Sequence, residues 1–237
     1  MIPAATSPAT LRVARVLTAT EAEGPGLRMA IWVQGCTIRC PGCFNPQLWA
    51  SAGGSDVSVA DWSPAILADA VAAGVEGITL LGGEPFEQAA ALAIVAAGAR
   101  ARGLSVMTFT GYDYADLRDW ARHRPDIADL LTHTDLLADG PYRADLVDRE
   151  RPWIGSTNQG LRALTDRYRD LEFTTVPDRV EVRVGADGTI AVNGWGDVDA
   201  LDALLHDLGR RADQPRSTYL RLPNSTSASA ASTPAPK

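Results

Sequence analysis

The sequence predicts an α/β fold in which the strands form an open, partial (β/α) barrel. Short apolar runs alternate with helix-like, alanine-rich segments, and this alternation is typical of parallel β/α units. Glycine and proline residues mark most of the boundaries, as expected where the chain changes from strand to helix. The strand–helix units are too few for a closed eightfold barrel, so we expect an open one.

The individual elements follow from the hydrophobic pattern. Apolar runs bounded by glycine, proline or polar residues predict strands over residues 11–17, 27–33, 77–81, 104–109 and 135–138. The first long helix is predicted to begin at Ser63 and Pro64, because serine caps helices and proline fits their first position. Further helices are expected from Pro85 to Gly103 and over residues 115–121.

The C-terminal part of the chain departs from this alternation. Residues 180–184 and 189–192 flank a glycine-containing turn and predict a β-hairpin, and a short amphipathic helix is expected over residues 198–208. From about residue 214 the chain is rich in Ser, Thr, Ala and Pro, a composition typical of disorder. We therefore expect a core over residues 11–170, a hairpin-and-helix appendage over residues 171–213 and a disordered tail over residues 214–237.

Composition excludes several classes of protein. A hydrophobic content of 46% supports a packed core, while a net charge of −7 argues against a nucleic-acid-binding protein, which needs a basic face. No apolar run reaches the length of a transmembrane helix, and the first residues show no secretory signal. Together with cysteines that suit a reducing compartment, these features predict a cytoplasmic protein with no membrane or nucleic-acid partner.

The three cysteines of the chain, Cys36, Cys40 and Cys43, lie within eight residues, directly after the strand expected over residues 27–33. An odd number cannot form a self-contained disulfide framework, and three thiolates are one ligand short of a closed zinc site. Three thiolates fit a four-iron cluster whose fourth iron is open to a small molecule. The alternatives are a zinc site completed by a distant histidine or aspartate, such as His123, and three incidental packed cysteines.

Further motifs surround the cysteines. The chain contains, in order, Gly24-Pro25-Gly26, the CxxxCxxC triad, Phe44-Asn45-Pro46-Gln47, Gly82-Gly83-Glu84-Pro85, Thr110-Gly111-Tyr112, Asp139-Gly140-Pro141-Tyr142 and Gly155-Ser156-Thr157-Asn158-Gln159. In order and spacing, this series resembles the radical S-adenosylmethionine (SAM) activating enzymes, and within them the branch that activates anaerobic ribonucleotide reductase. The resemblance extends from about residue 23 to about residue 164.

The resemblance implies a [4Fe-4S] cluster on the three cysteines, with SAM bound to the open iron. It implies an oxidoreductase that reductively cleaves SAM to a 5′-deoxyadenosyl radical and generates a glycyl radical on a partner enzyme, with flavodoxin or ferredoxin as the electron donor. Contacts to SAM are expected from Gly42, Phe44, Gly82, Gly83, Glu84, Thr110 and Asp139.

Most of these residues also have a simpler structural interpretation. Gly82 and Gly83 allow close approach of backbone to a ligand, but they also suit a plain strand–helix turn. Glu84 is expected either to receive the ammonium group of SAM or to favour the start of the next helix. Phe44 suits ordinary loop packing, and Asp139 suits a turn. Arg28, in the strand before the cysteines, is expected to face a carboxylate.

Two features leave the function open. About seventy residues follow the matching region, and we expect the hairpin among them to lie beside the docking surface for a partner. The alternatives are a radical SAM enzyme that modifies another peptide or small molecule, a non-catalytic iron–sulfur electron-transfer protein, and a zinc-stabilised binding module.

Overall fold

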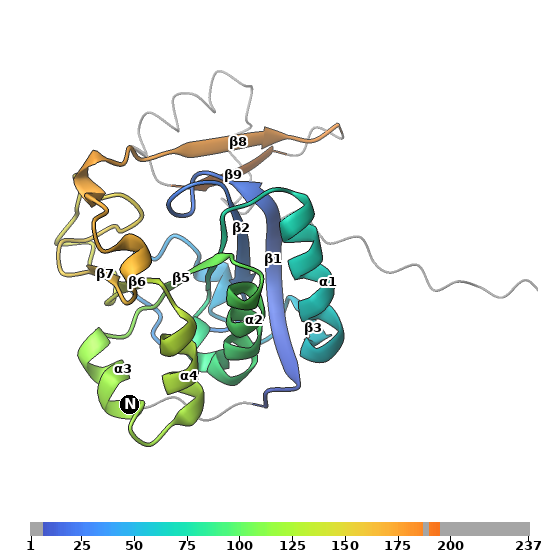
Figure 1. The fold of residues 1–237 in the computed structure, drawn as a ribbon. Coiled ribbons are helices and arrows are strands. Elements are labelled where there is room, and N and C mark those ends of the chain that lie inside the picture. The colour runs from blue at the N-terminus through green and yellow to red at the C-terminus, as the bar shows by residue number, and fades with distance from the viewer. Residues whose placement is uncertain (1–6, 187–189, 195–237) are drawn as a thin grey trace, which may run out of the picture.

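The computed structural model describes residues 7–186 and 190–194, which form two β-sheets (Figure 1). The larger sheet has seven strands in the order β3-β1-β2-β4-β5-β6-β7. The strands are β1 (Thr10–Thr20), β2 (Arg28–Val33), β3 (Ser55–Ser58), β4 (Gly77–Gly82), β5 (Ser105–Phe109), β6 (Leu136–Asp139), β7 (Gly160–Ala163) and, in the smaller sheet, β8 (Val180–Val184) and β9 (Ile190–Gly194). The predicted α/β class, the five core strands and the hairpin are confirmed.

The centre of the large sheet is parallel and its margins are antiparallel. Strands β2, β4, β5 and β6 pair in parallel, whereas β1, β3 and β7 pair antiparallel to their neighbours. The sequence patterns did not predict β3 and β7. Both are four residues long and partly exposed, so they lack the apolar run that marks a buried strand.

Helices cover one face of the large sheet (Figure 1). The helical segments are α1 (Val59–Ala72), α2 (Ala89–Ala101), α3 (Tyr114–Trp120), α4 (Pro125–His133) and the short 3-10 turns η1 (Pro46–Leu48), η2 (Pro85–Gln88), η3 (Asp166–Tyr168) and η4 (Phe173–Thr175). A single apolar core joins the helices to this face, with Leu67 of α1, Leu92 of α2 and Leu130 of α4 among its members. Helix α4 was not predicted, although Pro125 stands at its first position.

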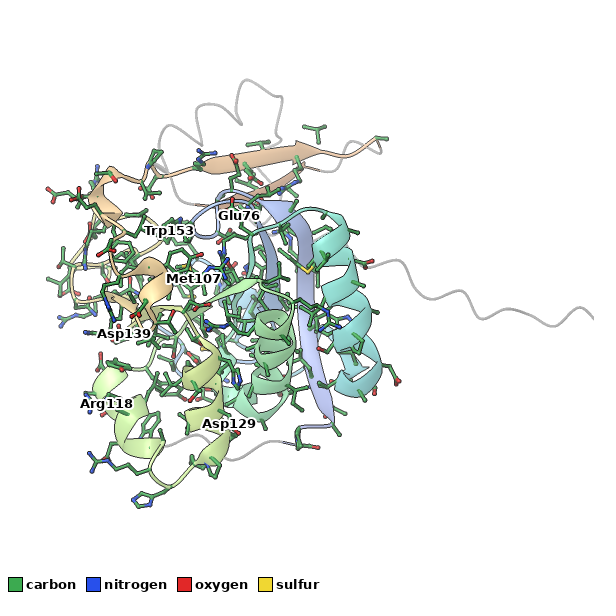
Figure 2. All side chains as sticks on the ribbon, in the orientation of Figure 1. Glu76, Met107, Arg118, Asp129, Asp139 and Trp153 are labelled. Carbon is green, nitrogen blue, oxygen red and sulfur yellow. The ribbon has the colours of Figure 1, made fainter. Side chains whose placement is uncertain are left out.

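The opposite face of the sheet is covered by loops. Two smaller apolar cores lie on it, one containing Leu48 and the other Trp153. Figure 2 shows Trp153 near Met107 of β5, and the two residues share the second of these cores. Strand β2 is buried on both faces, since Met29 and Ile31 belong to the helical core and Trp32 to a loop-covered one. Burial on both sides explains its continuous apolar sequence.

The predicted start of the first helix is wrong by about one turn. Helix α1 begins at Val59, directly after β3, and Pro64 lies inside it. The Val59 amide donates to the Ala9 carbonyl at 2.9 Å, so pairing between β3 and β1 fixes where the helix starts. Proline at position 64 removes the amide that would bond the carbonyl of Ala60. Both residues are exposed, so solvent satisfies that carbonyl.

The hairpin packs on the turn that follows β1. The Glu21 amide donates to the Glu181 carboxylate at 2.7 Å, and the Asn193 side chain donates to the Thr20 hydroxyl at 3.0 Å. This turn leads into β2, so the hairpin lies at the edge where the parallel strands begin (Figure 1). The cysteines follow the opposite end of β2, so the hairpin does not lie beside them. Its expected place beside the docking surface for a partner stays a prediction.

Other expectations for the C-terminal part fall outside the described residues. The turn between the two hairpin strands is only partly described, and the helix predicted over residues 198–208 and the tail predicted over residues 214–237 are among the residues not described. Within the described part, no helix combines the length and apolar character needed to cross a membrane.

A buried carboxyl group joins the hairpin to the core. Glu23 is only 5% exposed, and its Oε1 accepts hydrogen bonds from the Gly194 amide at 3.0 Å and the Asn193 side chain at 3.4 Å. Burial raises the pKa of Glu23 to about 7, although these hydrogen bonds and the nearby Arg15 oppose the shift. The hairpin therefore packs on an acid that titrates near neutral pH.

Replacing Glu23 with glutamine is expected to raise the free energy of unfolding above pH 7. The pKa of this carboxyl is about 7 in the folded chain and 4.5 when unperturbed, so the wild type loses stability as the pH rises between these values. The full loss is on the order of 3 kcal/mol, and the neutral amide avoids it. Urea unfolding at several pH values from 5 to 8 measures the difference. Glu150→Gln, at an exposed position, is the control. If the free energy of unfolding varies with pH in the same way for the wild type and Glu23→Gln, the prediction is contradicted.

Candidate metal centre

The cysteine loop leaves the sheet at the carboxyl end of β2. Cys36, Cys40 and Cys43 are half-buried free thiols. The Cys36 amide donates to the Trp49 carbonyl at 3.2 Å, and the Cys43 amide donates to the Cys40 carbonyl at 3.1 Å. The Gln34 side chain, from the residue after β2, donates to the Ala50 carbonyl at 2.7 Å. These bonds hold both ends of the loop at the sheet edge.

Backbone amides influence all three thiols. Burial raises the pKa of Cys36 to about 11, and the amides of Arg39 and Ile38 partly oppose this shift. Burial also raises the pKa of Cys40, and the Tyr142 amide opposes it. The Asn45 amide donates to the Cys43 sulfur at 3.4 Å. Amides directed at sulfur stabilise thiolates, and bound iron supplies the positive charge that keeps them ionised.

Backbone conformation supports this arrangement. Arg39 and Gly42 both lie in the left-handed region, with φ of 53° and 79°. For arginine this conformation is unusual, and here it belongs to the turn whose amides oppose the rise in the pKa of Cys36. A Cβ on Gly42 would stand 3.2 Å from the Tyr142 ring, so the loop that follows β6 lies against the cysteine loop.

The donor set fits a cluster better than a single ion. Among the described residues, no three His, Cys, Asp or Glu side chains gather closely enough to share one metal ion. His123 follows α3 and His133 ends α4, while His206 lies outside the described residues. In a four-iron cluster each thiolate binds a different iron, so the three sulfurs need not share one ion. Three thiolates are the donors that a four-iron cluster with one open iron requires.

Gly83 brings the second motif into contact with the cysteine loop. The Gly83 amide donates to the Val33 carbonyl and the Glu84 amide donates to the Gly35 carbonyl, both at 2.8 Å. A Cβ on Gly83 would lie 2.8 Å from the carbonyl carbon of Gly35 and closer still to its oxygen. Gly82, with φ of 111°, is packed equally closely against β2. The two glycines thus allow contact between two backbones.

Glu84 is a buried carboxylate at the same edge. It is 1% exposed, and it accepts hydrogen bonds from the Phe86 amide at 2.9 Å and from the Thr110 hydroxyl and Gly111 amide at 2.8 Å. Burial raises its pKa to about 7, and these three donors oppose the shift. Glu84 therefore both caps η2 and ties β4 to the end of β5. Its Oε2 accepts only one of these bonds, so it retains capacity for another donor.

Sequence reasoning missed Glu87, three residues further along. Its carboxylate accepts hydrogen bonds from the Thr37 amide at 2.8 Å, from the Thr37 hydroxyl, and from the Tyr112 hydroxyl at 3.2 Å. Thr37 stands next to Cys36, so Glu87 contacts the cysteine loop directly. The Tyr112 ring also packs edge-on against Trp120, at 5.0 Å between ring centroids. No sequence signal distinguishes Glu87 from an ordinary surface glutamate.

Asp139 and Phe44 are less closely tied to the cysteines. The Asp139 carboxylate accepts from Arg162 at 2.6 Å and from the Tyr114 amide at the start of α3 at 3.0 Å, so each of its oxygens bonds to a protein group. Phe44 is 52% exposed on the cysteine loop. In Figure 2, Asp139 lies on the side of the sheet away from the hairpin, whereas Glu76, before β4, lies near the hairpin. A SAM contact from Asp139 or Phe44 stays a prediction.

The segment over residues 155–159 closes a loop. Gln159 accepts from the Gly155 amide at 2.9 Å and donates to the Gly140 carbonyl at 3.0 Å, while Asn158 donates to the Pro141 carbonyl at 2.8 Å. These side chains therefore hold the chain that follows β6, next to the cysteine loop. Loop capping accounts for the contacts of these side chains.

Arg28 does not face the cysteines. Its guanidinium is fully buried and donates to the Thr79 hydroxyl at 2.7 Å, the Ser105 hydroxyl at 2.9 Å and the Tyr168 hydroxyl at 3.2 Å. These partners lie where β4 and β5 begin or beyond β7. The expectation of a carboxylate partner is wrong, because hydroxyl and carbonyl oxygens satisfy this cation.

Comparisons with known proteins agree with the chemistry of the loop. A family described as a 4Fe-4S single cluster domain matches residues 22–162. The anaerobic ribonucleoside-triphosphate reductase-activating protein of Vibrio cholerae is 29% identical over 149 residues, which cover 60% of this chain and 92% of that protein. The protein of the same name from Escherichia coli is 31% identical over 148 residues, with the same coverage.

A shorter match extends the comparison. The pyruvate formate-lyase-activating enzyme of Listeria monocytogenes is 35% identical over 83 residues, or 32% of each chain. The family match spans well over half of the chain and includes all three cysteines, Gly83 and Glu84. This chain therefore belongs to the 4Fe-4S single cluster family of radical SAM activating enzymes.

Proposed function

We propose that this protein is a radical SAM activase that generates a glycyl radical on a partner enzyme resembling anaerobic ribonucleotide reductase. The observation that carries the proposal is the junction at the carboxyl edge, where Gly83 touches the loop that bears the three cysteines. Relatives named as reductase-activating proteins match over nine-tenths of their own length, which supports the same activity here.

The cysteines would hold a [4Fe-4S] cluster, and SAM would bind beside it. When bound, these two cofactors supply the electron and the carbon-centred radical that removes a hydrogen atom. The chain contributes positioning: Glu84 retains an oxygen that fits the ammonium group of SAM, and Thr110 holds that carboxylate in place. The Gly82–Gly83 backbone packs directly on β2 and the cysteine loop, which holds that loop at the sheet edge.

The sheet supports an open-barrel interpretation of the fold. Its parallel strands are covered by helices on one face and by loops on the other, which is the arrangement expected of a partial (β/α) barrel. We assign the chemistry to the core over residues 11–170. A partner loop would then reach the cofactors from the carboxyl edge, away from the hairpin. A glycine fits such an approach because it has no side chain.

The direct test uses electron paramagnetic resonance. Anaerobically reconstituted protein, SAM, a reductant and a glycyl radical enzyme encoded with this chain are expected to yield an organic radical with a doublet signal. The doublet should collapse toward a singlet when the glycine α-hydrogen is replaced by deuterium. Flavodoxin or ferredoxin is the proposed natural electron donor, with dithionite as its substitute in the assay. If no candidate enzyme gives a radical signal, while deoxyadenosine forms in the presence of some other peptide, a peptide-modifying function would be favoured.

A further inference from the structure

One carboxylate beside the cysteine loop has no role in the chemistry described so far. Glu87, in η2, accepts two hydrogen bonds from Thr37 and one from the hydroxyl of Tyr112. Thr37 belongs to the loop after β2, whereas Tyr112 belongs to the loop after β5. The side chain of Glu87 thus joins two loops that are 75 positions apart in the chain and neighbours at the sheet edge.

The charge of Glu87 is not neutralised by a nearby cation. All three of its hydrogen-bond donors are uncharged, and none of the ion pairs formed by residues in the described part of the chain includes it. Glu84 likewise accepts only from two amides and a hydroxyl. Two carboxylates therefore lie on one side of the cysteine loop without a positive partner among these residues.

We propose that Glu87 is a positioning residue that fixes the first turn of the cysteine loop and that its negative charge lowers the reduction potential of the cluster. The proposal rests on the cluster assigned above. A fixed negative charge disfavours the arrival of an electron, and nearby charges and hydrogen bonds set the potentials of iron–sulfur clusters. A cluster with a lower potential is a stronger electron donor once it is reduced.

Reduction of the cluster involves one electron, which leaves an external reductant such as titanium(III) citrate and enters the cluster. Glu87 gains and loses no bond, and its influence on the reduced state is electrostatic. The hydrogen bonds to Thr37 act separately, because they hold the loop whether or not an electron is present. The charge and the positioning can therefore be tested with different variants.

Glu87→Gln tests the charge. Glutamine keeps the shape and an oxygen that can accept from Thr37, but it removes the negative charge. We expect the equilibrium constant for cluster reduction to rise about tenfold, which corresponds to about 59 mV for a one-electron couple. A redox titration followed by electron paramagnetic resonance measures it. Asp69→Asn on the exposed side of α1 removes the same charge away from the site and should leave the potential unchanged.

Glu87→Ala tests the positioning. Loss of the acceptor should increase hydrogen exchange in the peptide that contains Thr37, which mass spectrometry detects even in protein without a cluster. Release of the cluster to a chelator should become about tenfold faster, as for other residues that support metal ligands. Glu87→Gln should restore slow exchange and slow release. This rescue separates the lost hydrogen bonds from the lost charge.

The outcomes distinguish this proposal from the proposed function. If the wild type assembles no cluster, the proposed function and the effect on potential both fail, while exchange at Thr37 still measures the positioning. If a cluster assembles and Glu87→Gln has the potential of the wild type, the electrostatic role is overturned and the function stands. Unchanged exchange at Thr37 in Glu87→Ala overturns the positioning role.

Discussion

Alanine at Cys36, Cys40 or Cys43 is expected to lower the iron content of anaerobically reconstituted protein from about four atoms per chain to nearly none. Each thiolate would bind a different iron of the proposed cluster, and the described part of the chain offers no further cysteine to replace it. SAM cleavage should fall to the background rate, because the open iron exists only in the assembled cluster. Iron and sulfide analysis and the release of 5′-deoxyadenosine measure the two effects.

A control from the same loop makes this test specific. Pro41→Ala changes an exposed residue between two of the cysteines and should keep its iron. Circular dichroism should show that the cysteine variants remain folded, since the cysteines are absent from the three apolar cores. Stoichiometric zinc without iron, in wild-type protein purified in the absence of oxygen, would overturn the cluster assignment.

Alanine at Gly83 is expected to remove most of the iron as well, for a different reason. The added Cβ would overlap the Gly35 carbonyl, and hydrogen bonds on both sides hold the two backbones in register. Neither strand can move away without breaking the Gly83–Val33 or Glu84–Gly35 bond. Overpacking of this kind costs roughly 1–3 kcal/mol, so we expect a lower melting temperature together with a displaced cysteine loop.

Gly98→Ala is the matched control for Gly83→Ala. Its Cβ in α2 would meet the terminal methyl group of Leu67 at 2.9 Å, and a flexible side chain can move aside where a backbone carbonyl cannot. This variant should keep its cluster and close to wild-type stability. A Gly83→Ala protein with full iron content and unchanged melting would show that the close contact between the two loops is unimportant for assembly.

The parallel strands were predictable because they are buried on both faces. Strands such as β2 and β4 are mostly apolar, so their sequences alone mark them. Strand β7 was missed because its side chains are partly exposed, and with it the partner of Asp139 was missed too. Arg162 of β7 occupies one oxygen of that carboxylate. The ligand contact expected at Asp139 was thus predicted without knowledge of β7, the strand that carries its partner Arg162.

The site was predictable to the extent that spacing reveals it. The spacing of the cysteines indicates the chemistry of the site without three-dimensional information. The position of the glycine pair at the end of a strand does the same. Glu87 gives no such signal, because its role depends on Thr37 and Tyr112, which the fold brings to it from two different loops. The partners of the Arg28 side chain could not be predicted either, because the residues that accept its hydrogen bonds lie on other strands.

The position of the hairpin has a consequence for substitutions within it. The region matched by the 4Fe-4S single cluster family ends before β8, and the hairpin attaches where the parallel strands begin rather than where the cysteines lie. Substitutions in the hairpin are therefore constrained by its packing against Glu23, and not by the cysteine loop or the Gly83 junction, which lie at the other end of β2.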